Sequence, residues 1–121
     1  NLIANSNCGV YVSRAEGWNL ELLETMSMNR PVIASNVSSH REFCNSENSY
    51  LIDMPETELA DDGKAFRKQG NWAKVTNSTI DDIIDKMRYC YKNNISINIE
   101  GLETAKQLSW ENTAQKMVNL I

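Results

Sequence analysis

The sequence has no dense run of lysine and arginine, and no apolar run approaches the about 18 residues that a membrane-spanning helix needs. Its 12 Lys and Arg residues are outnumbered by 16 Asp and Glu residues, which gives a net charge of -4. An acidic chain without a basic patch does not fit a nucleic-acid surface or an anionic membrane. We therefore expect no nucleic-acid partner and no transmembrane segment, and we expect the chain to bind a small molecule or another protein.

Cysteine and histidine are also scarce. Cys8, Cys44 and Cys90 lie far apart with no CxxC spacing, and His40 is the only histidine. Such cysteines are typical of reduced, partly buried thiols, so we expect a cytoplasmic protein and no metal ion. His40 could face a binding cleft, but we expect it at the surface of a short helix.

Short apolar runs at residues 9–13, 32–35 and 50–52 are typical of strands in a parallel sheet, and we expect the first two to be buried. A helical segment joins these two, as a right-handed β-α-β crossover requires. Residues 55–78 break the alternation with glycines and mixed charges, and are predicted to form an inserted loop or irregular hairpin. The sequence therefore predicts an α/β fold, a Rossmann-like parallel sheet with helices on both faces, in a single domain over residues 1–121.

Helical spacing of apolar residues predicts five helices. We expect Asn19 to cap the first, Ser39 with Glu42 to cap the second, and Thr79 with Asp82 to cap the third. The stripe of the third helix, Ile80, Ile83, Ile84, Met87, Cys90 and Tyr91, is expected to pack on the sheet. The first four helices are predicted from Leu20 up to Asn29-Arg30-Pro31, from Ser39 to Cys44, from Thr79 to Tyr91, and from about Asn98 to Leu108. The last helix is predicted to begin at the cap Ser109. Its apolar residues are Trp110, which we expect in the core, and Ala114, Met117, Val118 and Ile121.

The segment EGWNLELLE, residues 16–24, places one glutamate before the first helix and another on its second turn. In parallel α/β sheets, ligands bind beyond the carboxyl ends of the strands, beside helix N-termini whose free N–H groups favour phosphate. Gly17 permits close approach of the backbone to a ligand. Carboxylates accept hydrogen bonds from paired hydroxyls, such as those of a ribose or a hexose. A ligand with sugar hydroxyls at Glu16 and at Glu24 and a phosphate between them would be a nucleotide sugar. The alternative is that both glutamates serve only helix capping and solvation.

Residues 12–43, VSRAEGWNLELLETMSMNRPVIASNVSSHREF, resemble the donor-binding signature of the retaining glycosyltransferases of the glycogen-synthase and sucrose-synthase type, often called family four. The shared features are the Ser-Arg pair, Glu-Gly-aromatic, seven residues between two glutamates, Pro-Val-Ile and a later Glu. NSYLID is similar to a strand of that family, and LSWENTAQKMVNLI is similar to its final helix. The resemblance covers the chain except residues 55–78.

The resemblance implies a role for each residue of this segment. Glu16 would bond hydroxyls of the donor sugar and position it for transfer, which makes it the expected catalytic residue. Asn19 stands where the family usually has a second glycine, and Ser38-Ser39 where it has a glycine pair, which puts sugar selectivity in doubt. The donor-binding residues that the resemblance implies are Gly17, Trp18, Asn19 and Leu20 for the diphosphate or sugar, and Glu24 for the ribose.

The resemblance also implies an activity and an organisation. The chain is similar to the second half of the C-terminal, donor-binding domain of a GT-B enzyme, a retaining hexosyltransferase that uses no metal and no cofactor beyond its nucleotide-sugar substrate. The resemblance implies that an Arg and a Lys bind the leaving group and that an N-terminal domain binds an unknown acceptor. These parts would precede Asn1 in a parent chain. We therefore expect this piece alone to be inactive.

Two other interpretations remain open. The chain could be a non-catalytic GT-B-like binding or scaffold module, in which case Glu16 would be dispensable. It could instead be an unrelated nucleotide-phosphate α/β protein in which the glutamates only cap. Two side chains also have two possible roles each. Arg14 could reach a phosphate or form a surface salt bridge. Trp72 could cover a sugar ring or anchor the insert to the body of the protein.

Overall fold

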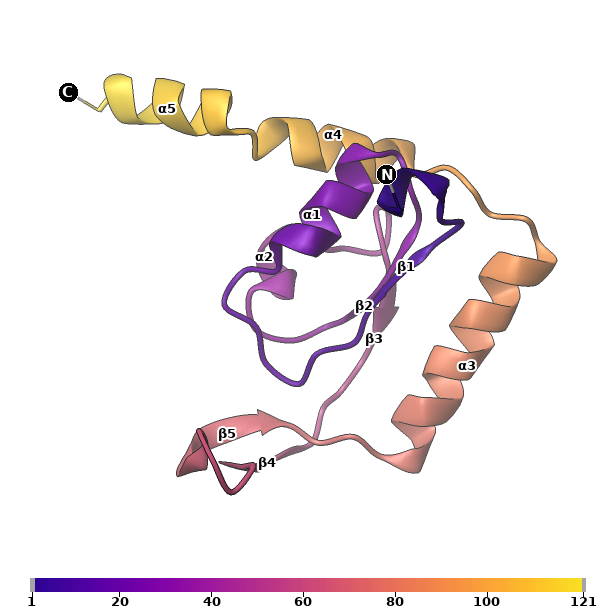
Figure 1. Ribbon diagram of the computed structural model, residues 1–121, viewed down its shortest axis with the longest axis vertical. Coiled ribbons are helices and arrows are strands. Elements are labelled where there is room, and N and C mark those ends of the chain that lie inside the picture. Colours follow the sequence, from indigo (N-terminus) through magenta and orange to yellow (C-terminus); the bar gives the residue numbers. More distant parts are fainter. Residues whose placement is uncertain (1, 121) are drawn as a thin grey trace.

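The computed structural model describes residues 2–120 and shows a small parallel sheet between helices, with a separate hairpin and a projecting C-terminal helix (Figure 1). Within residues 2–120, no helix has the length and the apolar composition that a membrane span needs. In chain order the elements are the 3-10 helix η1 (Ile3–Asn5), β1 (Gly9–Tyr11), α1 (Leu20–Ser27), β2 (Val32–Ser35), α2 (His40–Phe43), β3 (Tyr50–Ile52), β4 (Thr57–Asp61), β5 (Arg67–Ala73), α3 (Asn77–Lys92), α4 (Ile99–Gln107) and α5 (Trp110–Val118).

The central sheet has the strand order β1-β2-β3, and all its pairs are parallel. The predicted strands at 32–35 and 50–52 are confirmed, and the first strand ends at Tyr11 rather than at Ser13. β2 is buried along its whole length, as expected for the central strand. The prediction that the first strand is buried is wrong, because β1 lies at the edge of the sheet and Val10 is 44% exposed. The α/β class and the parallel sheet are confirmed.

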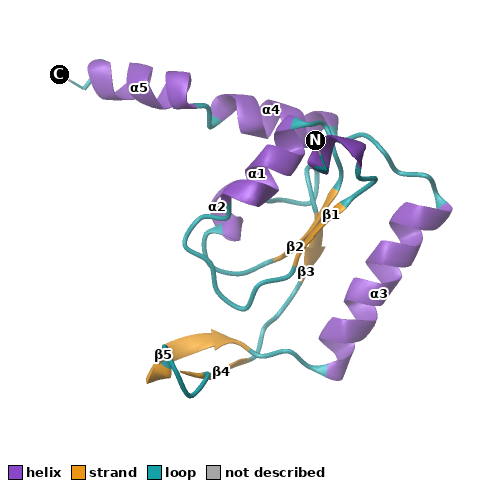
Figure 2. Cartoon of the chain, in the orientation of Figure 1, coloured by secondary structure: helices purple, strands orange, loops and turns teal. Residues whose placement is uncertain are grey.

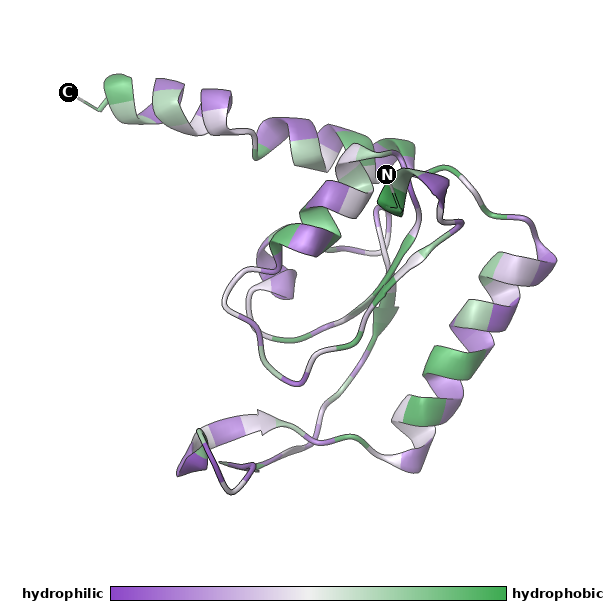
Figure 3. Ribbon diagram, viewed as in Figure 1, coloured by the Kyte–Doolittle hydropathy of each residue, from purple (hydrophilic) through white to green (hydrophobic). Residues whose placement is uncertain are grey.

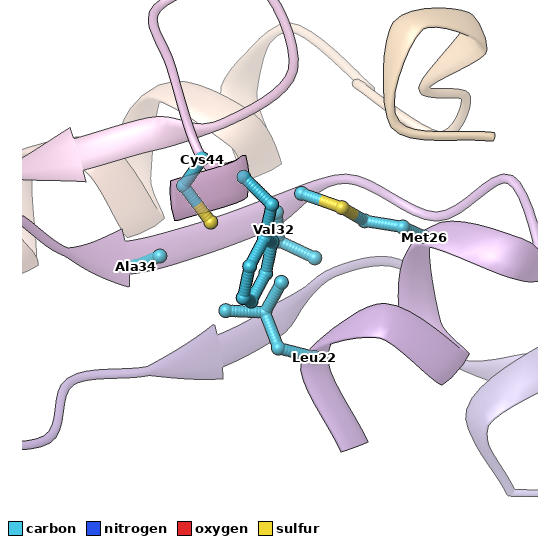
Figure 4. Close-up of a cluster of buried hydrophobic side chains, with 6 residues drawn as sticks. Leu22, Met26, Val32, Ala34 and Cys44 are labelled. Carbon is cyan, nitrogen blue, oxygen red and sulfur yellow. The ribbon is translucent and has the colours of Figure 1, made fainter. Parts of the chain in front are cut away.

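Two hydrophobic clusters lie on opposite faces of the sheet, because successive side chains of β2 point to opposite sides. Val32 and Ala34 pack with Leu22 and Met26 of α1 on one face (Figure 4). Ile33 packs on the other face, in a cluster that also contains Ile52, Met54, Ala73 and Cys90. Helices therefore cover both faces, with α1 and α4 on one side and α3 on the other (Figure 1).

The predicted helices form, but two of their predicted N-terminal caps are wrong. Ser39 precedes α2 without a side-chain cap hydrogen bond, because α2 is a single turn that the chain enters in a helical conformation. α3 begins earlier than expected, at Asn77, with Thr76 as its N-cap and Thr79 completing the capping box. The capping side chain thus lies three residues before the predicted one. Asn19, Asn98 and Ser109 cap α1, α4 and α5 through their side chains.

Two predicted apolar surfaces are more exposed than expected. Hydrophobic and hydrophilic residues alternate along α3 (Figure 3), yet Met87 is 49% exposed and Tyr91 is 82% exposed, so only part of its stripe packs on the sheet. Trp110 was expected in the core and is 84% exposed, because α5 projects away from the sheet. Ile121, assigned to the same stripe, lies outside the described residues.

The segment 55–78 contains an antiparallel hairpin of β4 and β5 with a register irregularity between Leu59 and Asp61. Its turn is organised by Asp62, whose carboxylate accepts hydrogen bonds from the backbone N–H groups of Lys64, Ala65 and Phe66. These backbone donors lower the pKa of the Asp62 carboxyl group. The hairpin is therefore a folded element of its own beside the central sheet.

Candidate functional site

The candidate site is the loop of residues 12–19, which leaves the carboxyl end of β1 and enters α1 (Figure 2). The loop that follows β2 and leads into α2 lies at the same end of the sheet, because β1 and β2 are parallel neighbours. The carboxyl edge of a parallel sheet is where α/β proteins bind their ligands. The glutamate segment identified from the sequence occupies this edge.

Glu16 is half-buried, and its orientation is set within the loop itself. The Ser13 hydroxyl donates a hydrogen bond of 2.6 Å to Glu16 Oε1. Among residues 2–120, Glu16 Oε2 receives no such bond, so one carboxylate oxygen is held while the other can accept a hydrogen bond from a ligand. Sequence reasoning missed the role of Ser13, although a hydroxyl residue three positions before a glutamate in a loop is a local signal.

Asn19 connects the loop to the first turn of α1. Its backbone is left-handed, with φ of 71°, a conformation that asparagine tolerates better than most residues. The side-chain Oδ1 accepts a hydrogen bond from the Leu22 N–H at 3.2 Å, which makes Asn19 the N-cap, as predicted. Asn19 thus supplies the backbone turn that glycine would permit and adds a cap that glycine lacks.

His40 lies beneath this turn, and the expectation that it is a surface residue is wrong, because its side chain is fully buried. Its Nδ1 lies 2.9 Å from the backbone oxygen of Ser35, which can only accept, so Nδ1 carries a proton. In the neutral ring Nε2 is then an acceptor, and it lies 2.9 Å from the Asn19 amide nitrogen. The imidazole therefore joins the end of β2 to the N-cap of α1.

The other predicted donor-binding residues form an open surface around the start of α1. A side chain added at Gly17 would meet no atom within 4 Å, so the backbone there is open to an approaching molecule. Trp18 is 40% exposed and packs on Phe43 with 5.2 Å between the ring centroids. Leu20 is 55% exposed. Gly17, Trp18 and Leu20 are therefore exposed on the approach to the first helical turn.

Glu24 is exposed on the second turn of α1, whereas Leu22 and Met26 of the same helix are buried. The structure does not bring Glu24 into contact with Glu16. The two carboxylates instead lie on either side of the first turn of α1, one before the helix and one on it. A ligand that reached both would therefore extend along the N-terminal part of α1.

The start of α1 combines the partial positive charge of a helix N-terminus with the negative charges of Glu16, Glu21 and Glu24. The backbone N–H groups of Leu20 and Glu21 belong to the first helical turn and have no carbonyl partner within the helix, and the helix dipole adds partial positive charge. Arg14 does not add to this charge, because its guanidinium forms a salt bridge with Glu58, as one of the two alternatives predicted. The helix terminus itself is thus the group at this loop that could attract a phosphate.

Arg14 instead holds the β4–β5 hairpin against the loop. Its Nε donates a hydrogen bond of 2.8 Å to the Ala73 backbone oxygen, and its guanidinium lies 3.9 Å from the centroid of the Trp72 ring. The Ala73 N–H donates to the Arg14 carbonyl at 2.9 Å. Trp72 therefore anchors the hairpin to the body of the protein, which is the second of the alternatives given for it.

Within the part of the chain that the structure describes, no three or more His, Cys, Asp or Glu side chains are grouped so that they could hold a metal ion. A cavity of about 420 Å³ lies between β1 and α3, and none of the predicted donor-binding residues lines it. The candidate site is therefore an open surface and is distinct from that cavity.

A comparison with known protein families places the chain among the glycosyl transferases group 1, whose model matches residues 1–66. The match covers more than half of the 121 residues and includes the whole loop and helix of the candidate site, so the chain belongs to this family. No curated protein matches the chain. Glycosyl transfer, with a sugar donor and an acceptor, is the activity of this family, and the parallel α/β sheet agrees with a GT-B fragment.

Proposed function

We propose that this chain is the nucleotide-sugar-binding part of a retaining hexosyltransferase that acts in the cytoplasm. The observation that carries the proposal is the half-buried Glu16, which Ser13 holds beside the open N-terminus of α1. A fixed carboxylate next to a helix terminus offers hydroxyl recognition and phosphate recognition within one short segment. A nucleotide-diphosphate sugar carries both kinds of group.

In this proposal the diphosphate lies at the first turn of α1. Gly17 leaves room for the phosphates to approach the backbone, and the unpaired N–H groups of Leu20 and Glu21 donate to them. Charge that develops on the leaving diphosphate is met by the same dipole, so the helix terminus lowers the barrier by stabilising the transition state. No metal is part of this proposal. The free cysteines of the chain support the cytoplasmic assignment.

The two glutamates take different parts of the donor. Glu16 accepts hydrogen bonds from sugar hydroxyls through the oxygen that Ser13 leaves open, and so positions the anomeric carbon for transfer. Glu24, further along α1 and exposed, accepts hydrogen bonds from the ribose hydroxyls. Trp18 and Asn19 shape the turn between them. Transfer itself requires an acceptor domain and basic residues from a parent chain, so we expect the isolated 121-residue piece to be inactive.

The test is calorimetric titration of the full-length parent protein with UDP-, GDP- and ADP-sugars, for the native protein and for Glu24→Ala. Loss of hydrogen bonds to a charged group costs about 1.5–3 kcal/mol, so we expect one donor to bind and the substitution to weaken it by roughly 10- to 150-fold. Glu100→Ala, which removes an exposed glutamate from the first turn of α4, is the matched control and should leave affinity unchanged.

Each other outcome supports a different interpretation. If no nucleotide sugar binds, the chain is a GT-B-like binding or scaffold module rather than a donor site. If plain nucleotides bind as tightly as nucleotide sugars and Glu24→Ala has no effect, the glutamates only cap the helix. If a donor binds with native affinity after Glu24→Ala, the ribose assignment fails while donor binding stands.

A further inference from the structure

Two thiols from distant parts of the sequence lie together on the face of the sheet away from α1. Cys8 directly precedes β1, and Cys90 lies near the end of α3. Both line the cavity of about 420 Å³ between these elements, beside Ile33 and Ile95, and both belong to the hydrophobic cluster on that face. The fold therefore brings the two cysteines described in this cluster to one cavity.

The two thiols also influence each other electrostatically. Cys90 contributes to the raised pKa of Cys8, and the Cys8 thiol donates a hydrogen bond of 3.4 Å to the Gly9 carbonyl oxygen. Burial raises the pKa of the Cys8 thiol to about 12 and raises that of Cys90 as well, so both are neutral at physiological pH. A neutral, apolar disulfide suits the same surroundings.

We propose that Cys8 and Cys90 form a redox-sensitive dithiol that closes into a disulfide between the start of β1 and the last turns of α3. Both thiols line one cavity and belong to one hydrophobic cluster, a placement from which a disulfide can close. Among the described residues, Thr79 and Cys90 are the only fully buried ones of α3. The disulfide would fasten the end of this helix to the edge strand of the sheet.

The oxidant is a small-molecule disulfide such as oxidised glutathione. Cys8 is partly exposed and reacts first: its thiolate attacks one sulfur of the small disulfide, and one small thiolate leaves. The Cys90 thiolate then attacks the Cys8 sulfur, which forms the Cys8–Cys90 bond and releases the second small thiolate. Two electrons pass to the small disulfide, and the two cysteine protons end on the two released thiols. The raised pKa values make the reaction slow but leave the product stable.

The third cysteine provides an internal control. Cys44 is buried in the other cluster, with Leu22 and Met26, and burial raises its pKa too, yet it has no neighbouring thiol in that cluster. It should therefore stay reduced under conditions that link Cys8 to Cys90. Any general effect of oxidation on buried thiols would affect all three.

The experiment incubates the full-length protein with a graded series of oxidised and reduced glutathione, blocks remaining thiols under denaturing conditions and maps the peptides by mass spectrometry. We expect a linked Cys8–Cys90 peptide, Cys44 blocked as a free thiol, and a melting temperature that rises on oxidation and returns after reduction. Cys8→Ser should abolish the rise, whereas Cys44→Ser should keep it. The proposal is overturned if Cys8 and Cys90 remain free while a reference dithiol oxidises, or if intermolecular links form instead. The native protein decides this even if a variant does not fold.

Discussion

The side-chain amide of Asn19 and the imidazole of His40 form a hydrogen bond of 2.9 Å beneath the turn that enters α1. This bond joins the loops that follow two adjacent parallel strands, because Asn19 belongs to the β1–α1 loop and His40 begins α2 after β2. His40 is in turn held by the Ser35 carbonyl oxygen. The left-handed turn of the candidate site thus depends on a buried residue of the neighbouring loop.

The first prediction concerns His40. His40→Ala removes the partner of the buried Ser35 carbonyl oxygen and of the half-buried Asn19 amide and leaves a cavity, so we expect it to lower the free energy of unfolding by about 2–4 kcal/mol. His40→Phe keeps most of the volume but not the hydrogen bonds, and should also destabilise. Urea denaturation measures both. Glu42→Ala, an exposed change in the same short helix, is the control and should stay within about 0.5 kcal/mol. Native stability in His40→Phe would show that these hydrogen bonds contribute nothing.

The second prediction separates the backbone of Asn19 from its side chain. Asn19→Gly permits the positive φ and keeps a good N-cap, but it leaves the buried His40 Nε2 without its partner, so we expect it to lower the free energy of unfolding by about 1–3 kcal/mol. Asn19→Ala loses the same hydrogen bond and also loses the cap and strains the turn, so it should cost about 1–2 kcal/mol more than Asn19→Gly. If the turn serves donor binding, calorimetry on the parent protein should find affinity kept in Asn19→Gly and weakened in Asn19→Ala. Equal affinities would disconnect the turn from the ligand.

The third prediction tests the role of Ser13 as a positioning residue. Ser13→Ala removes the hydrogen bond that orients Glu16, which is worth about 1 kcal/mol, so we expect kcat/KM of the parent transferase to fall about 5-fold. Glu16→Gln should be far more damaging, because in the proposed function it alters the group that binds the sugar hydroxyls. Ser27→Ala, which removes an exposed hydroxyl bonded to the Glu24 carbonyl oxygen, is the matched control and should have native activity. A Ser13→Ala enzyme with native kcat/KM would contradict the positioning role.

Local features of the fold could be predicted from the sequence. The strands at 32–35 and 50–52 and the capping role of Asn19 depend on residues close together in the chain, and the structure confirms each. At the site, the same holds for the placement of Glu16 before α1 and of Glu24 on it. Spacing along one segment is sufficient to order these residues along a loop and a helix.

Features that depend on distant contacts could not be predicted. His40 is buried because residues of β2 and of the β1–α1 loop enclose it, and no local pattern records that enclosure. Trp110 has the spacing of a core residue, yet α5 projects from the body and leaves it exposed. Arg14 finds Glu58 and Trp72 only because the hairpin folds back on the loop. Tertiary packing decided all three.

The last prediction concerns alkaline pH and Cys8. Burial raises the pKa of this thiol from 9.0 to about 12, so between these values the unfolded chain loses the proton while the folded chain keeps it. Stability should therefore be unaffected by this group below pH 9 and should fall as the pH rises from 9 toward 12. Because Cys8 is partly exposed, we expect a slope well below the limit of about 1.4 kcal/mol per pH unit that a single titrating group can give.

Urea denaturation at pH 8 to 10.5 under reducing conditions measures this fall in the native protein and in Cys8→Ser. The lysines contribute equally to both proteins, whereas the raised pKa of Tyr50 depends in part on Cys8, so the difference between the two slopes reports the Cys8 thiol together with its coupling to Cys90 and Tyr50. We expect the native protein to lose stability more steeply than Cys8→Ser, and Cys44→Ala provides a second comparison at a buried thiol of the other face. Parallel curves for the native protein and Cys8→Ser would mean that the Cys8 thiol titrates as freely in the folded chain as in the unfolded one.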